Sequence, residues 1–232
     1  MVKKKEAKKK KISKKEREEK KEKIEDKKHE DQENKILKMI FLTVGVVVLL
    51  IAGIYIYTQA QVNFTYKNIE FQKNRIGEID FYETKTLATA GDGSLFGFRL
   101  RTKPSVLENI PFKGSENLRL MKINGYSYEE NSTFNCEGDG IIAIANLQRL
   151  FSKQGMEFLR DPNSTCDPEG RYNYFKIKYG PATEIDEVGP NCYDIVITGN
   201  DEGCQILPAT EKLMVDVYSR YLLVTKSGLK TP

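Results

Sequence analysis

The chain has 232 residues, among them 37 Lys or Arg, 33 Asp or Glu, four Cys, one His and no Trp. One folded domain of about 100–200 residues fits this length with some chain left over, which excludes two large domains. Residues 1–38 carry 17 basic and 10 acidic side chains, whereas residues 39–232 carry 20 and 23. The positive charge belongs to the N-terminal segment alone, which excludes a uniformly basic nucleic-acid-binding domain.

The first segment, residues 1–38, is predicted to be a disordered or transiently helical charged tail. Nine Lys and one Glu fall within residues 1–15. The stretch from Lys3 to Lys15 is a candidate for nonspecific attraction to anionic lipid or RNA. The alternative is a solubilising tail that sets the topology and has no partner. The single histidine, His29, lies in this tail among charged residues.

A strongly apolar stretch follows the tail. Met39 to Tyr57 are 19 consecutive residues without a charge, Asn, Gln or Pro. As a helix they would be roughly 28 Å long, which matches the hydrocarbon core of a bilayer. We predict a single transmembrane helix over residues 39–59. A cleaved signal peptide is the alternative, but it would have a short basic head and an apolar core of about 7–15 residues.

The orientation follows from the basic residues beside this segment. Residues 18–38 contain seven Lys and residues 58–78 only three basic side chains, which predicts a cytoplasmic N-terminus at the cell membrane. Residues 60–232 then form an extracytoplasmic domain. All four cysteines fall there, an even number that suits disulfides: Cys136, Cys166, Cys192 and Cys204. The sequons at Asn131 and Asn163 are candidate glycosylation sites.

The hydrophobic pattern of this domain predicts an α+β fold of antiparallel strands with two helices. Strands are expected over 64–66 and 69–71 with a bulge between them, over 79–81, over 96–100 after a turn at 90–94, and over 118–123. A helix over 139–154 would be capped by Asp139 and stopped by Gly155. Strands over 172–179 and 184–188, joined as a hairpin at Gly180-Pro181, precede a strand over 193–198. A helix from Pro208 to about Leu223 would bury one stripe, made of Leu213, Val217 and Tyr221.

The expected hairpin suggests how the cysteines pair. It would place residues near 170 opposite residues near 192, which favours Cys166 with Cys192 and leaves Cys136 with Cys204. The two other connectivities stay open. A metal or redox site is the alternative, but the spacings contain no CxxC and no histidine partner, so we expect no metal and no cofactor.

Catalytic chemistry is limited because no histidine follows residue 29. A His-dependent triad or general base is therefore excluded from the domain, and we expect no enzyme activity. The carboxylates Glu78, Asp80 and Glu83 could supply the paired acids of a glycosidase. The alternative is structural, because acidic residues that alternate with Ile79 and Phe81 are typical of the solvated face of a strand.

A basic row is the one further site that the sequence suggests. Arg99, Arg101 and Lys103 recur at period two and are candidates for anion contact. The alternative is an ordinary solvated strand face. The slightly acidic domain argues against nucleic acid as its partner.

Several short motifs carry a resemblance: Phe64-x-Tyr66, Leu100-Arg101-x-x-Pro104 with Ile110-Pro111, Thr165-Cys166-Asp167, Asn191-Cys192-Tyr193, Cys204 and Ala209-Thr210-Glu211-Lys212. In this order they resemble a group of uncharacterised archaeal single-pass membrane proteins, over residues 37 to 223. The resemblance implies the topology, the cysteine positions and an archaeal surface setting, and it implies no activity.

These observations predict a membrane-anchored interaction or structural module that is part of a cell-envelope complex with an unidentified protein partner. The alternative is a sensor or receptor that binds a small ligand outside the cell. A third class, an extracytoplasmic hydrolase that uses carboxylates, would require a pocket that brings carboxylates together.

Overall fold

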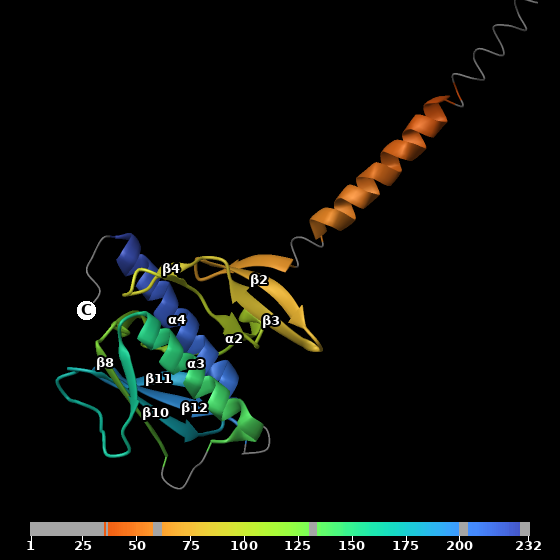
Figure 1. Cartoon of the computed structure of the whole chain (residues 1–232). Helices are drawn as coiled ribbons and strands as arrows, with labels where there is room; N and C mark the ends of the chain where they lie inside the picture. The colour runs from red at the N-terminus through yellow and green to blue at the C-terminus, as the bar shows by residue number, and fades with distance from the viewer. Residues whose placement is uncertain (1–34, 36, 58–61, 130–133, 200–203, 228–232) are drawn as a thin grey trace, which may run out of the picture. The chain divides into compact units, whose positions relative to one another are not determined.

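The computed structural model describes residues 35, 37–57, 62–129, 134–199 and 204–227, and it divides the chain into two units, residues 1–59 and 60–232 (Figure 1). The described part of the first unit forms a helix, Leu37–Tyr57, with a mean hydropathy of 2.8 and no buried residue in its most apolar stretch. The hydroxyl of Thr43 donates to the carbonyl of Met39 at 2.8 Å, so this polar group is satisfied inside the helix. The helix is long and apolar enough to cross a membrane.

The predicted boundaries of this helix differ slightly from the observed ones. It includes Leu37 and Lys38, which the sequence pattern assigned to the tail, and the predicted residues 58 and 59 lie outside the described residues. The tail before residue 35 also lies outside them.

The second unit has the predicted α+β architecture. Its first sheet contains β1 (Asn63–Tyr66), β2 (Ile69–Ile76), β3 (Ile79–Thr84) and β6 (Arg99–Leu100), all antiparallel and in that order. This confirms the antiparallel meander. The predicted bulge between β1 and β2 is wrong, because Lys67 and Asn68 form a two-residue turn with φ of 48° and 63°. Positive φ at both central positions matches the twist of a tight hairpin.

The face of β3 that packs on the core is the opposite of the expected one. Tyr82 and Thr84 are buried, whereas Ile79 is 44% exposed and Phe81 only partly covered. The register explains this, because Tyr82 pairs with the fully buried Leu100 and side chains alternate strictly along a strand. Ile79, Phe81 and the carboxylate Glu83 therefore share the outer face, which is partly apolar.

The second sheet is mixed. Its strands are β7 (Phe112–Lys113), β8 (Ile123–Tyr128), β9 (Glu157–Arg160), β10 (Asn173–Tyr179), β11 (Glu184–Gly189) and β12 (Cys192–Ile197), in the order β7-β11-β12-β10-β8-β9. Only β11 and β12 are antiparallel, and β10 runs parallel to both β8 and β12. The expected hairpin at Gly180-Pro181 is therefore wrong. The chain reverses instead at Pro190 and Asn191, where Asn191 has a φ of 56°.

The segment before β8 also differs from the expectation. Ser115–Asn117 form a short 3₁₀ helix, η1, and Leu118 is buried outside any strand. The strand begins only at Ile123. A third, two-stranded sheet pairs β4 (Ala88–Thr89) with β5 (Leu95–Phe96) around the predicted turn at 90–94.

The helices are α2 (Pro104–Leu107), α3 (Asp139–Lys153) and α4 (Ile206–Lys226), with a 3₁₀ turn η2 (Cys136–Gly138) before α3. Both long helices were predicted. Asp139, however, is the first residue of α3 and not its cap, because Gly138 holds that position. Gly155, with a φ of 77°, follows the end of α3 as expected.

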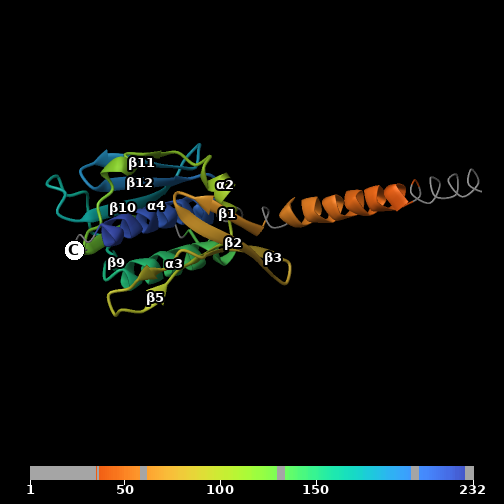
Figure 2. The same ribbon diagram turned by 90° about the horizontal axis from the view of Figure 1, so that it is seen from above.

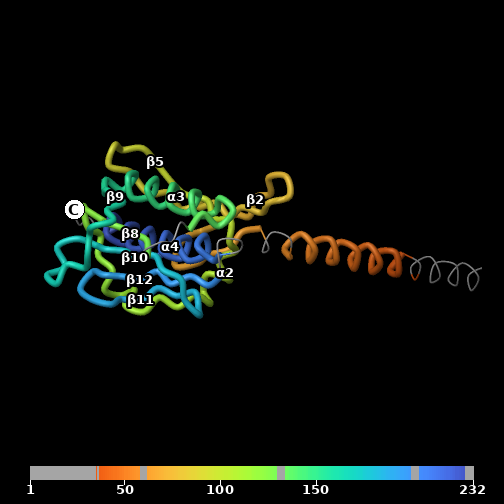
Figure 3. Tube along the Cα trace, turned by 90° about the horizontal axis from the view of Figure 1, so that it is seen from below, coloured from red at the N-terminus to blue at the C-terminus, as the bar shows by residue number. Residues whose placement is uncertain are grey.

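Helix α4 is the centre of the domain. Figures 1 and 2 show α3 and α4 side by side on one face of the six-stranded sheet, and in the trace of Figure 3 α3 runs along the β9 edge of that sheet and α4 along its middle strands. The predicted stripe Leu213, Val217 and Tyr221 is buried, but so is nearly every other residue from Ile206 to Tyr218. A helix that is covered on all sides organises the core from within.

Two disulfides close the domain as predicted. Cys136 pairs with Cys204, with Cα atoms 5.5 Å apart, and Cys166 pairs with Cys192 at 5.6 Å. The reason for the second pairing differs from the expected hairpin. Cys192 lies opposite Tyr174 across the parallel pair β10 and β12, so Cys166, which precedes β10, lies at the end of the sheet where β12 begins.

Candidate binding groove

A groove of about 980 Å³ lies between the outer face of the first sheet and α3. Ile79, Phe81 and Glu83 of β3 line it together with Arg99 of β6. On the other side α3 contributes residues spaced by three, four and seven positions, which fall on one face of a helix: Ile142, Asn146, Arg149, Leu150 and Lys153. Its volume lies near the upper end of the range for ligand pockets, about 300–1,000 Å³.

The segment from Leu87 to Phe98 forms the third side of the groove, and hydrogen bonds hold it in place. The Gly91 N–H donates to the carbonyl of Lys153 at 3.4 Å, which ties the turn at 90–94 to the end of α3. The hydroxyl of Tyr218 on α4 donates to the carbonyl of Phe96 at 3.0 Å. This side of the groove is therefore fixed by both long helices.

Close packing also shapes the groove at Gly97. A Cβ atom at this position would lie 2.1 Å from Oγ1 of Thr84, so no larger residue fits without a shift. The same Oγ1 accepts a hydrogen bond from the Phe98 N–H at 2.9 Å. The wall thus depends on a glycine beside a buried hydroxyl.

The groove is basic. Four cationic side chains line it, Arg99, Arg101, Arg149 and Lys153, against the single carboxylate of Glu83. Arg99 forms an ion pair with Glu83, and Lys153 lies 3.5 Å from Asp92. Arg101 pairs with Asp139 at 2.8 Å. Among the residues that the structure describes, no partner of the Arg149 guanidinium is found.

The structure brings two of the three predicted anion-contact residues together. Arg99 and Arg101 both line the groove. Lys103 does not, since β6 ends at Leu100 and the expected period-two row stops there. Lys103 is exposed at the N-terminal cap position of α2. The prediction of one basic row is therefore wrong for Lys103.

The three carboxylates that the sequence suggested as a catalytic group are separated. Asp80 pairs with Lys73 at 2.6 Å on the core-facing side of β3. Glu83 faces the groove and pairs with Arg99, and Glu78 is exposed in the turn before β3. Glu83 therefore lies on the outer face of β3 as predicted. Asp80 lies on the face toward the core, because the faces of this strand are the reverse of those expected.

A buried carboxylate on α4 was not predicted from the sequence as a functional group. Glu211 is fully buried and accepts hydrogen bonds from the backbone N–H groups of Arg101 at 2.7 Å and Thr102 at 2.8 Å. Burial raises the pKa of this carboxyl from 4.5 to about 7, although these hydrogen bonds favour the charged form. Glu211 therefore positions the backbone of Arg101 at the edge of the groove.

A second polar group on α4 binds the first strands. The amine of Lys212 donates to the hydroxyl of Tyr66 at 3.1 Å and lies 3.6 Å from Asp216. Asp216 also forms an ion pair with Lys67 in the turn between β1 and β2. The signal in the sequence was a set of charged residues inside an otherwise apolar helix.

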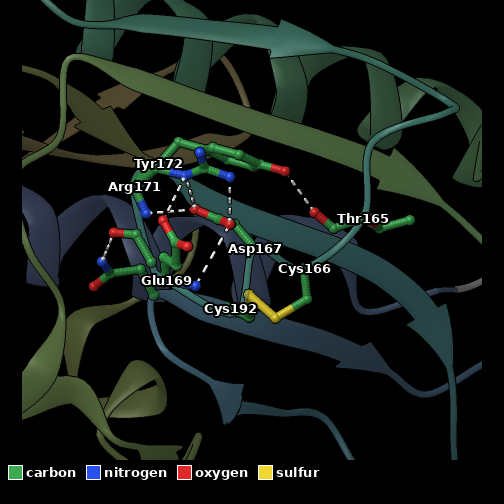
Figure 4. Close-up of a disulfide and its surroundings, with 9 residues drawn as sticks. Thr165, Cys166, Asp167, Glu169, Arg171, Tyr172 and Cys192 are labelled. Carbon is green, nitrogen blue, oxygen red and sulfur yellow. Dashed lines mark hydrogen bonds and ion pairs between the residues drawn. A yellow bond between two sulfur atoms is a disulfide. The ribbon is translucent and has the colours of Figure 1, made fainter.

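The loop beside the second disulfide has an ion pair between the buried carboxylate of Asp167 and the exposed guanidinium of Arg171 (Figure 4). Asp167 accepts a hydrogen bond from the Arg171 backbone N–H at 2.7 Å and from both Nε and Nη2 of its guanidinium at 3.0 Å. These bonds hold the pKa of Asp167 at about 2, well below its usual range. The hydroxyl of Tyr172 donates to the carbonyl of Thr165 at 2.7 Å and completes the loop. This arrangement supports the Cys166–Cys192 bridge.

The remaining predicted positions are on loops or outside the described residues. Asn163 is exposed in the loop after β9, whereas Asn131 and the stretch from Lys3 to Lys15 lie outside the described residues. Within the part of the chain that the structure describes, no cluster of three or more His, Cys, Asp or Glu side chains could hold a metal ion.

No model of a protein family, no curated protein and no solved structure matches this chain.

Proposed function

We propose that the chain is a single-pass, membrane-anchored binding module whose disulfide-bonded domain lies outside the cytoplasm. The observation that carries this proposal is the pairing of a wholly exposed apolar helix with a domain that contains two disulfides and no free cysteine among the described residues. Disulfides persist in oxidising compartments, which supports an external location. The excess of lysine before the helix supports a cytoplasmic N-terminus.

The partner proposed for this module is a component of the cell envelope, because a membrane anchor joined to a disulfide-bonded external domain would place its binding surface there. The basic tail from Lys3 to Lys15 would add nonspecific attraction to anionic lipid or RNA at the inner side of the membrane.

A ligand-binding sensor is the second candidate function, and the groove beside α3 favours it. A purely structural module needs no pocket of this size, and apolar walls with a few charged groups are typical of small-molecule sites. Both candidates place binding in the external domain.

The test is disulfide mapping by mass spectrometry on the full chain in native membranes, with free thiols blocked before extraction. The proposal expects two bridges, 136–204 and 166–192. Four free thiols would contradict an oxidising compartment and with it the proposed topology.

A second measurement addresses orientation. With a peptide tag at each end of the chain, an impermeant protease added to intact cells should remove the C-terminal tag and leave the N-terminal tag until lysis. Loss of the N-terminal tag alone would overturn the proposed orientation.

A further inference from the structure

The groove exposes apolar side chains from three separate parts of the fold. Ile79 on β3 is 44% exposed, Leu87 47%, Leu95 on β5 67% and Ile142 on α3 38%. Scattered apolar side chains are normal on a protein surface, but a gathered apolar patch with a polar rim indicates a binding site. The walls are thus suited to an aliphatic body.

The charge of the groove is opposite to that of the domain around it. Residues 39–232 carry more acidic than basic side chains, yet the groove has four cations and one carboxylate. Arg99, Arg101 and Lys153 already have acidic partners. Arg149 is exposed and has no acidic partner among the described residues, so its guanidinium is accessible to an anionic head group.

Two other occupants fit the groove poorly. The tail of residues 1–38 carries an excess of basic charge and would be repelled. An extended peptide binds by adding a strand to an exposed edge, but β5 and β6 beside the groove are two residues long each. The groove walls are formed mainly by side chains, which suit a flexible alkyl chain that has no backbone groups to pair with a strand.

We infer that the groove binds a single-chain amphiphile with an anionic head group, represented by a long-chain carboxylate. The alkyl chain lies between Ile79 and Phe81 on one side and Ile142 on the other, with Leu95 over it, and the carboxylate pairs with Arg149. This inference rests on the proposed binding module and names the chemical class of its ligand.

The experiment uses the full chain in phosphatidylcholine nanodiscs and a long-chain fatty acid with a photoreactive diazirine in its alkyl chain. The methyl ester of the same probe is the uncharged comparison. After irradiation, crosslinked peptides are identified by mass spectrometry. The acid should label peptides that contain residues 79–83, 94–98 or 142–153, and the ester should label them about fivefold less, because the ion pair to Arg149 is lost.

Three variants sharpen the result. Arg149→Gln should reduce labelling by the acid about fivefold, to the level of the ester. Arg119→Gln, an exposed arginine outside the groove lining, is the matched control and should label like the native chain. Ile142→Trp fills the groove from an exposed helix position, so it should block labelling while the thermal unfolding temperature stays close to that of the native chain.

Equal labelling by acid and ester, unchanged labelling of Arg149→Gln, or labels confined to Leu37–Tyr57 would each overturn the inference. The proposed function fails by a different result, namely the free thiols or the reversed orientation described above. A chain that has both bridges and the expected orientation but is not labelled in the groove would contradict the inferred ligand class. It would not contradict the proposed binding module.

Discussion

The amine of Lys212 lies 3.1 Å from the hydroxyl of Tyr66, which is 146 residues earlier in the chain. The contact is buried and joins the central helix α4 to β1, the first strand after the apolar helix. With Asp216 and Lys67 it forms a network in which two cations share one carboxylate.

Removing Lys212 should therefore be costly. Lys212→Ala leaves Asp216 with a single partner and opens a void, so we expect the free energy of unfolding to fall by about 3 kcal/mol. Tyr66→Phe removes only one hydrogen bond and should cost about 1 kcal/mol. Urea denaturation of the domain measures both. Lys176→Ala, at an exposed position of β10, is the control, and equal losses for Lys176 and Lys212 would contradict the importance of the network.

Glu211 should make stability fall as the pH rises. Its pKa is about 7 in the folded chain against 4.5 ordinarily, so between these values the folded chain holds a proton that the unfolded chain has released. The free energy of unfolding should thus decrease by about 3 kcal/mol from pH 4.5 to above pH 7. Glu211→Gln cannot titrate and should lose this slope. Denaturant unfolding at several pH values measures it, and an unchanged slope in the variant would assign the effect to other groups.

Asp167 should act in the opposite direction and at lower pH. Its pKa is about 2 in the folded chain, below the ordinary 3.8, so the unfolded chain takes up a proton first as the pH falls. The stabilisation by Arg171 is present above about pH 4 and is lost as the pH falls toward 2. Asp167→Asn should flatten the acid limb of the stability curve, whereas Asp161→Asn in the neighbouring exposed loop should not. Identical acid limbs for Asp167→Asn and the native chain would refute this assignment.

The two disulfides should contribute comparable stability despite their different loops. They span 68 and 26 residues, and the shorter loop lies inside the longer one. With the inner bridge intact, the outer one closes a shortened loop, so chain entropy gives about 4 kcal/mol for it and about 3.5 kcal/mol for the inner one. Cys136→Ser/Cys204→Ser and Cys166→Ser/Cys192→Ser, compared by denaturant unfolding, check this. A loss below about 1 kcal/mol for either pair would exclude the entropic explanation.

The apolar helix should fail to insert when a charge stands at its centre. Val47 is the middle residue of Leu37–Tyr57, and an arginine there costs about 2.5–3.5 kcal/mol of insertion free energy. Val47→Arg should shift the full chain out of carbonate-washed membranes, while Val47→Leu should remain. Equal retention of both variants would show that this helix does not hold the chain in the membrane.

The sequence predicted the parts of the fold that depend on local pattern. Nineteen uncharged residues define the apolar helix, and the capping region around Gly155 and the turn at 90–94 follow from residues close together in the chain. The order of the six-stranded sheet could not be predicted in this way. The neighbours of β10 in the sheet are β8 and β12, and neither directly precedes or follows it in the chain. The Gly180-Pro181 pair predicts a turn but not which strand pairs with β10.

The site was predicted only in part for similar reasons. Arg99 and Arg101 stand out because they alternate with apolar residues, but Arg149 resembles any solvated residue of a helix. The faces of β3 were assigned in reverse, since Ile79 and Phe81 are as apolar as Tyr82 and the pattern alone cannot decide which side is covered. The burial of Glu211 and Lys212 depends on the strands that cover α4, which no local pattern reveals.

The parallel pairing of β10 with β12 also bears on the order in which the disulfides form. The native register of these two strands brings Cys166 and Cys192 together at one end of the sheet. Once closed, it removes most of 26 residues from the 68-residue loop that Cys136 and Cys204 must close, and shorter loops close at a lower entropic cost. We therefore expect the inner bridge to form first, which leaves Cys136 and Cys204 only each other as partners instead of the three pairings open to four free cysteines.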